Sequence, residues 1–276
     1  MQQSSIKKIE DDYANQKKDL SKITVFQQQS ECIEENIPLL FSDDIQDQLF
    51  SLCNFTKYLL DHDFILPPNY LERTVELFQR NVENPEFTSS ILFFYRRCTG
   101  FPSQMQNFLS DLNIIDLISP FFPQPNVLAI LGNLSIPILS NRQKLLSNGI
   151  LKSLTQIILL NKDENQTIDF EVFDYAVNLI NCLVLPTEEL DYSQWHEEIV
   201  CIFDILFDDY DHVPFEQKKT IIKAFSDYIE TDVFFMTDFR DKGYLRKFFE
   251  VDFPDQDDMK TIYLSLIDIC RYIVHL

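Results

Sequence analysis

Glycine is scarce in this sequence: only Gly100, Gly132, Gly149 and Gly243 occur among 276 residues. Loops that cradle phosphate groups need several closely spaced glycines, because backbone N–H groups must approach the ligand. The scattered glycines therefore exclude a nucleotide-binding loop of this kind. The four histidines are also dispersed and have no partner residues at catalytic spacing. We expect no enzymatic activity and no cofactor.

Basic residues are few as well: 23 Lys and Arg stand against 44 Asp and Glu, which gives a net charge of −21. Nucleic acids and anionic membranes both require a cationic surface, so neither is expected as the main partner. A basic protein or peptide segment is compatible with this charge. A solvated acidic coat without a binding role explains the same composition.

Long apolar runs and paired cysteines are missing too. No run approaches the roughly 20 residues that span a membrane, and the polar N-terminus does not resemble a signal peptide. The six cysteines lie in helical patterns without Cys-x-x-Cys pairs. They are expected to be buried thiols in a reducing compartment, and Cys98 is expected to be an inert core residue.

What the sequence does contain is a repeat, marked by residues suited to positive φ. In "NRQKLLSNGILKSLTQII", Gly149 separates two helical patterns, as expected where one helix ends and another begins at a sharp angle. Gly243 and Asn113 occupy the same place in similar segments, and Asn69 precedes a fourth. The segment "QWHEEIVCIFDILF" begins a further unit without such a mark. The period is about 43 residues.

Each junction is followed by a turn and a longer amphipathic helix. Pro85, Pro125, Pro214 and Pro254 are expected at or just before the starts of these longer helices, where a missing N–H is harmless. A short helix and two longer ones at this period are typical of armadillo repeats. We therefore predict an all-α fold, a right-handed α-solenoid of about six armadillo-type repeats over residues 36–276. Residues 1–35 are predicted to be a charged N-terminal arm or an extra helix.

Four segments occur in this order along the chain: "SDDIQDQLFSLCNFTKYLL", "LPPNYLERTVELF", "NPEFTSSILFFYRRCTG" and "LAILGNLS". Together with later segments they resemble importin-α, the armadillo adaptor that carries basic nuclear-localisation signals to importin-β. The resemblance implies a non-enzymatic adaptor that binds extended protein segments in a concave groove and takes part in nuclear protein import. It implies a location in the cytoplasm, the nucleus or both.

In that family each third helix supplies a tryptophan and, four residues later, an asparagine. The indoles form slots for lysine stems, and the asparagines hold the peptide backbone. Asn133 and Asn181 match two of these asparagines, and Gly100 matches a family position close to bound cargo. These three are the candidate peptide-binding residues. The remaining positions are changed: the ladder aligns with Leu92, Arg96, Ala129, Val177, Lys223 and Asp227, and the family's lysine-pairing aspartate aligns with Pro137.

These changes imply weakened recognition of basic signals. The lost carboxylate contact alone is worth about 1.5–3 kcal/mol, and Ala129 and Val177 would line shallow slots beside the two asparagines. The family's arm binds importin-β through many Arg and Lys residues. Residues 1–35 here carry five lysines, no arginine and seven acidic residues. This composition argues against an importin-β contact of the usual kind.

Two other interpretations remain open at this point. The chain could be an armadillo scaffold or regulatory protein unrelated to nuclear transport, or a catalytic or metal-regulated protein built on its loops. Residues 163–174 space oxygen ligands like a calcium loop but have Ile168 where the loop needs glycine. Residues 208–212 form an acidic loop with one histidine, for which solvation is the simpler explanation. The single tryptophan, Trp195, is expected to pack between helical layers.

Overall fold

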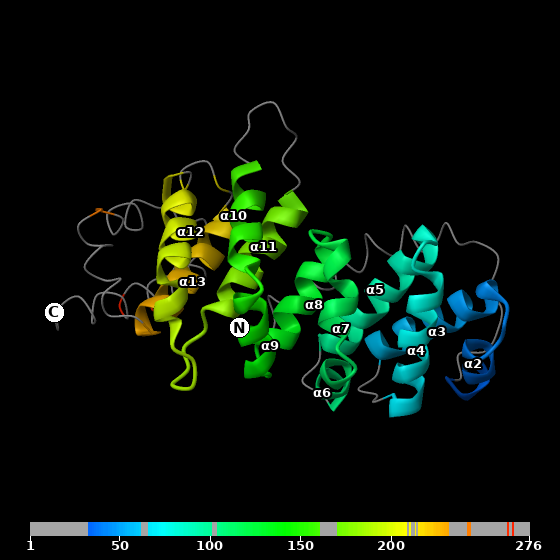
Figure 1. Cartoon of the computed structure of the whole chain (residues 1–276). Helices are drawn as coiled ribbons and strands as arrows, with labels where there is room; N and C mark the ends of the chain where they lie inside the picture. The colour runs from blue at the N-terminus through cyan, green and yellow to red at the C-terminus, as the bar shows by residue number, and fades with distance from the viewer. Residues whose placement is uncertain are drawn as a thin grey trace. The chain divides into compact units, whose positions relative to one another are not determined.

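A computed structural model describes residues 33–61, 66–100, 104–160, 170–208 and 215–231, together with residues 210, 213, 242, 243, 264 and 267. All regular secondary structure in these residues is helical (Figure 1). The chain divides into two compact units, Met1–Phe64 and Ile65–Leu276. None of the helices in the described ranges combines the length and the apolarity needed to cross a membrane. The predicted boundary between residues 35 and 36 falls within α2 (Ile33–Leu40), and residues 1–32 lie outside this part of the chain, so the predicted division stays a prediction.

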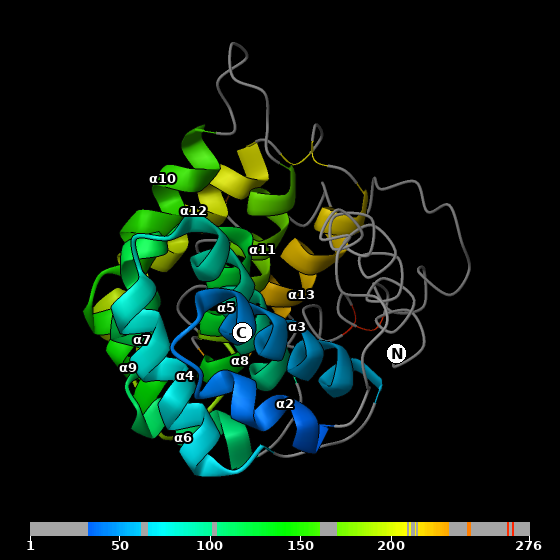
Figure 2. The ribbon, with the colours of Figure 1, turned by 90° about the vertical axis from the view of Figure 1, so that its right-hand side faces the viewer.

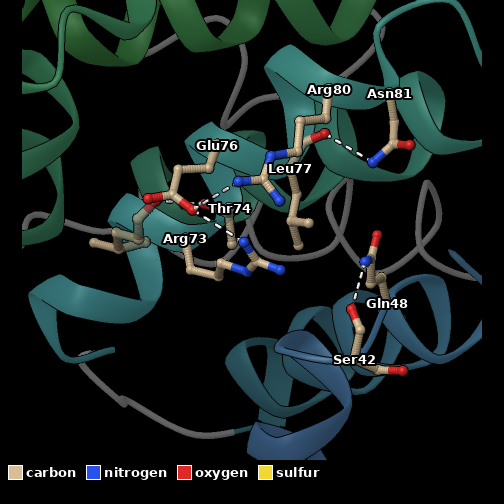
Figure 3. A network of polar contacts seen from close by, with 9 residues as sticks. Ser42, Gln48, Arg73, Thr74, Glu76, Leu77, Arg80 and Asn81 are labelled. Atoms are coloured by element: carbon tan, nitrogen blue, oxygen red, sulfur yellow. Dashed lines mark hydrogen bonds and ion pairs between the residues drawn. The ribbon is translucent and has the colours of Figure 1, made fainter. Parts of the chain in front are cut away.

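The first unit contains α2 (Ile33–Leu40) and α3 (Ile45–Asp61), which pack against each other. The turn between them is fixed by polar contacts. The Ser42 hydroxyl donates to Asp47 at 2.7 Å, and Gln48 Nε2 donates to the Ser42 carbonyl at 2.7 Å (Figure 3). The Asp44 side chain caps α3 by accepting from the backbone N–H of Gln46 at 2.8 Å. This cap satisfies a backbone N–H that the start of α3 would leave unpaired.

The second unit is a succession of helices joined by short turns. In chain order they are α4 (Pro68–Asn81), α5 (Pro85–Thr99), α6 (Gln104–Asp111), α7 (Ile114–Ile118), the 3₁₀ helix η1 (Ser119–Phe121), α8 (Pro125–Ser135), α9 (Leu139–Ser147), α10 (Ile150–Leu160), α11 (Phe170–Leu183), η2 (Tyr192–Trp195), α12 (His196–Asp208) and α13 (Phe215–Thr231).

These helices form two layers within the second unit. The third helix of each repeat packs on the third helix of the next, in the order α5, α8, α11, α13. On the other side α6 contacts α7, α9 contacts α10, and α10 contacts α12 (Figure 2). Residues at helical spacing on the facing sides are buried, such as Ile91, Leu131 and Ile180. A short helix, a second helix and a longer third helix thus recur along the chain.

The predicted junction residues adopt the expected backbone at three of four positions. Asn113 has φ 56°, Gly149 has φ 77° and Gly243 has φ 72°. The prediction for Asn69 is wrong, because this residue lies in the first turn of α4. Pro67 and Pro68 precede it, and a proline in the first turn starts a helix instead of ending one.

Two of the four predicted prolines start third helices. Pro85 begins α5 and Pro125 begins α8. At α5 the preceding residue, Asn84, adds a cap: its side chain accepts from the N–H of Phe87 at 3.1 Å. Pro214 and Pro254 lie outside the described residues.

A polar link joins α7 of one repeat to α9 of the next. Lys144 donates to Asn113 Oδ1 at 2.6 Å and pairs with Asp116 at 2.8 Å, and Asn113 Nδ2 donates to Asp116 at 2.5 Å. The hydrogen bond from Lys144, followed by that from Asn113, lowers the pKa of the Asp116 carboxyl below its ordinary value. Asn113 therefore both makes the sharp turn and holds the neighbouring repeat.

Arg142 is a buried cation that ties three repeats together. Only 4% of it is exposed, on α9. Its guanidinium donates to the carbonyls of Ser135 at 3.2 Å and Leu185 at 2.8 Å, and to the Tyr192 hydroxyl at 3.1 Å. Ser135 is the last residue of α8, where helix carbonyls lack intrahelical partners, and Leu185 lies two residues beyond the end of α11. One side chain thus joins the C-terminus of α8 to the segment that follows α11.

The prediction that the cysteines are buried is right for Cys98 and wrong for Cys201. Cys98 is fully buried, and this burial raises the pKa of its thiol, so it is not an activated nucleophile. Cys53 and Cys182 are half-buried, whereas Cys201 is exposed on α12. Within the described residues, none of these four cysteines forms a disulfide. Trp195 is 6% exposed at the end of η2, as expected for a packed residue.

Candidate functional site

Each third helix leaves one stripe of side chains uncovered, and we call the surface made by these stripes the third-helix face. The stripes are exposed or half-exposed, in contrast to the buried residues on either side. Their members on the described helices are Phe93 and Arg96 on α5; Asn126, Ala129 and Asn133 on α8; Asp174, Tyr175, Asn178 and Asn181 on α11; and Lys219, Lys223 and Asp227 on α13. Amide side chains dominate the central two helices.

Two of the three candidate residues come together. Gly100 follows the last turn of α5, and a Cβ placed on it would lie 4.0 Å from Nδ2 of Asn133. Asn133 Nδ2 donates to the Thr99 hydroxyl at 3.3 Å, which orients the amide towards the end of α5. Gly100 is exposed and has an ordinary φ of −72°. A Cβ here would also lie 3.3 Å from the Arg96 carbonyl oxygen, which is a tight contact.

Asn181, the third candidate, is half-exposed on α11, but its amide is only partly available. Its Oδ1 atom is enclosed and accepts no hydrogen bond in the described part of the chain. A peptide could therefore contact this side chain through its amide nitrogen alone. An enclosed amide oxygen without a donor costs about 1–3 kcal/mol.

The slot predicted beside Asn181 is not present. Val177 is completely buried, so it does not line the third-helix face. Neighbouring residues on a helix point about 100° apart. The next residue, Asn178, is half-exposed instead of Val177, and its side chain donates to the Asp174 carbonyl at 2.8 Å. Ala129 is half-exposed beside Asn133, as predicted. Leu92 is fully buried, like Val177.

The Arg96 side chain on α5 contacts two other helices of the third-helix face. Its Nη1 atom donates to Asn126 Oδ1 on α8 at 3.2 Å, and its Nη2 atom donates to the Tyr175 hydroxyl on α11. The guanidinium carbon also lies 4.8 Å from the centre of the Tyr175 ring, within cation–π distance. One side chain from α5 therefore crosses α8 and ends on α11. The sequence alone indicated only that Arg96 stands where the importin-α family has an asparagine.

Metal chemistry has little support in the described ranges. They contain no group of three or more His, Cys, Asp or Glu that could hold a metal ion. Most of the proposed calcium loop, and three residues of the 208–212 segment, lie outside these ranges. Nδ1 of His196 is within 3.1 Å of the Tyr228 hydroxyl, between α12 and α13, where both side chains belong to the packing of the two helices.

No protein-family model matches the chain, and no curated protein matches its sequence. Solved structures do match. The designed armadillo repeat protein YIII(Dq)4CqI has a TM-score of 0.62 and 14% identity, with 86% of this chain and 100% of that one covered. The fold is of the armadillo-repeat type. A structure of computationally designed armadillo repeat proteins for modular peptide recognition has a TM-score of 0.61 and 14% identity. The match covers 86% of this chain and 99% of that one.

A third similar structure is the designed armadillo repeat protein YIII(Dq.V1)4CPAF in complex with the peptide (KR)4. It has a TM-score of 0.62 and 13% identity, and the match covers 86% of this chain and 99% of that one. At these identities the similarity concerns the fold. It confirms the predicted all-α solenoid of armadillo-type repeats. Membership of the importin-α family stays a prediction.

Proposed function

We propose that this chain is a non-enzymatic adaptor that binds an extended protein segment along the third-helix face. One observation carries the proposal: consecutive third helices line up side by side and present half-exposed asparagines, while the residues beneath them are buried. An extended peptide has free N–H and C=O groups along its length, and amide side chains both donate and accept. The similar designed proteins include one made for modular peptide recognition and one that holds a peptide.

The proposed binding is weaker than in a protein with a complete tryptophan–asparagine ladder. Asn133 keeps an accessible amide, but the neighbouring Ala129 offers no aromatic wall against which a lysine stem could stack. Asn181 has an enclosed oxygen, and exposed Pro137 has no charge to offer a lysine. A role in nuclear protein import therefore comes with weakened recognition of basic signals. The alternative is an armadillo scaffold outside nuclear transport, and the cationic Arg96 on this face favours it.

Titration of a fluorescein-labelled basic signal peptide, followed by anisotropy at physiological salt, tests the proposal. We expect weak binding, at least about tenfold weaker than that of an importin-α with an intact ladder, because a charge-assisted contact is missing. The affinity should fall further as added salt shortens the Debye length to below about 8 Å.

The variant Asn133→Ala combined with Asn181→Ala should weaken this binding further. Asn148→Ala is the matched control, since Asn148 is exposed at the end of α9 in the other layer. Tight binding abolished by the double variant would mean that the site is a full import site. No binding at any salt concentration would favour a scaffold unrelated to nuclear transport.

A further inference from the structure

Arg96 differs from several other cations of the described chain in what holds it. Lys144 pairs with Asp116 at 2.8 Å, Lys242 with Asp204 at 2.5 Å and Arg73 with Glu76 at 3.0 Å (Figure 3). In a chain of net charge −21, carboxylates are abundant partners. Arg96 has none within the described residues: its contacts are the neutral side chains of Asn126 and Tyr175.

The hydrogen-bonding capacity of Arg96 is only partly used. A guanidinium has five N–H donors in a fixed plane. One bond goes to Asn126 and one to Tyr175, which leaves donors unsatisfied at a half-exposed position. The Tyr175 ring and the Asn126 amide hold the plane in place, so little side-chain entropy remains to be lost when a ligand binds.

An acidic residue on α11, next to Tyr175, bonds to another repeat. The Oδ1 atom of Asp174 accepts from Gln217 Nε2 on α13 at 3.2 Å. The side-chain contacts of Arg96 itself are with the neutral Asn126 and Tyr175.

We propose that Arg96 receives a carboxylate side chain of the bound segment, so that the third-helix face selects an aspartate or glutamate at this point and disfavours a lysine. A planar guanidinium and a carboxylate form charge-assisted hydrogen bonds, often two in parallel. The inference rests on the proposed function, because it specifies one residue of the same bound segment. It also supplies a physical reason for weak binding of basic signals.

The test uses the full chain and three labelled peptides of equal length, in which serine alternates with glutamate, glutamine or lysine. The alternation places the varied residue opposite Arg96 in an extended peptide. At physiological salt we expect the glutamate peptide to bind about tenfold or more tightly than the glutamine peptide, and the lysine peptide to bind less tightly than the glutamate peptide.

Arg96→Gln should remove the preference for glutamate. Arg80→Gln is the matched control: it removes the same charge from α4, where the side chain is 64% exposed and lies 4.0 Å from Glu76 (Figure 3). This control should leave the ratio of the two affinities unchanged. Arg96→Lys keeps the charge but loses the planar fork, so the preference should shrink without reversing. Circular dichroism melting curves verify that each variant is folded.

The outcomes separate the two proposals. Binding of the glutamine peptide without a preference for glutamate, or a preference that survives Arg96→Gln, overturns the role of Arg96 and leaves the adaptor function standing. Failure of all three peptides to bind overturns the adaptor function and this inference together.

Discussion

Arg142 and Arg96 are both held by neutral oxygen atoms, and their burial separates their roles. Arg142 lies beneath the surface and bonds to carbonyls at the end of α8 and just after α11, whereas Arg96 is half-exposed on the third-helix face. Burial of the Tyr192 hydroxyl, which accepts from Arg142, raises the pKa of that tyrosine, so it stays neutral at physiological pH. Arg142 is therefore structural, and Arg96 can meet a ligand.

Replacement of Arg142 by methionine should destabilise the protein by at least about 2 kcal/mol, because several buried acceptors lose their donor at once. The measurement is the midpoint of urea unfolding, followed by circular dichroism. Arg80→Met is the matched control, at an exposed position on α4, and should change stability by no more than about 0.5 kcal/mol. Equal effects of the two substitutions would contradict the assignment of Arg142 as a link between repeats.

The candidate peptide-binding residues came from the resemblance to importin-α, and the structure brings two of the three together. Asn133 and Gly100 were both expected at the peptide site, and they lie next to each other. Val177 was placed on the same face, but the chain turns it into the core and exposes Asn178 instead. The spacing of four residues between Val177 and Asn181 shows only that both lie on the same side of one helix. It does not show which side of that helix packs against the neighbouring helices. The contacts of Arg96 with residues 30 and 79 positions later were equally out of reach.

At the scale of elements, the junctions between first and second helices depend on a single backbone conformation. Gly149 has φ 77°, and a Cβ added to it would meet nothing within 4 Å. Strain from the backbone, and not a steric clash with a neighbour, is therefore the cost of any substitution here. Asn113 makes the same turn at φ 56° without glycine, since asparagine tolerates the left-handed region better than other residues.

Gly149→Val should consequently destabilise the protein by more than about 1 kcal/mol, because a β-branched residue at positive φ is strained. Gly149→Asn, which copies the natural choice at Asn113, should cost clearly less. Thermal melting of the two variants beside the wild type gives the comparison. An unchanged melting temperature for Gly149→Val would show that this turn does not need its left-handed backbone.

Element starts and stops were the best predicted feature, because prolines and positive-φ residues act locally. Pro85, Pro125, Asn113 and Gly149 took their predicted places, and Gly243 has the predicted positive φ. Asn69 failed because two competing local signals overlap: Pro67 and Pro68 start α4 just where the asparagine was expected to end a helix. Sequence periodicity also could not show that α7 has only five residues and continues as η1.

At the scale of the whole chain, the third-helix face does not share the acidic excess of the chain. The net charge is −21, yet the described face carries Arg96, Lys219 and Lys223 beside Asp174 and Asp227. The excess of acid is therefore carried elsewhere. Net charge governs self-repulsion and long-range attraction, whereas side chains on the face decide which residue of a bound segment is accepted. The sequence predicted the net charge, but only part of the set of side chains on the third-helix face.

Self-repulsion of this excess charge should make salt stabilising. When sodium chloride rises from about 10 to about 150 mM, the Debye length falls from about 30 to about 8 Å and repulsion between distant carboxylates is screened. The same salt weakens exposed pairs such as Lys152 with Glu198 at 3.4 Å, but such pairs contribute about 1 kcal/mol or less. We therefore expect the melting temperature at pH 7 to rise by a few degrees, at about 2–4 °C for each kcal/mol. Near the isoelectric point, about pH 4.4, the rise should disappear because the net charge is small. A melting temperature that falls with salt at pH 7 would show that attractive pairs, and not the net charge, dominate the electrostatics of this chain.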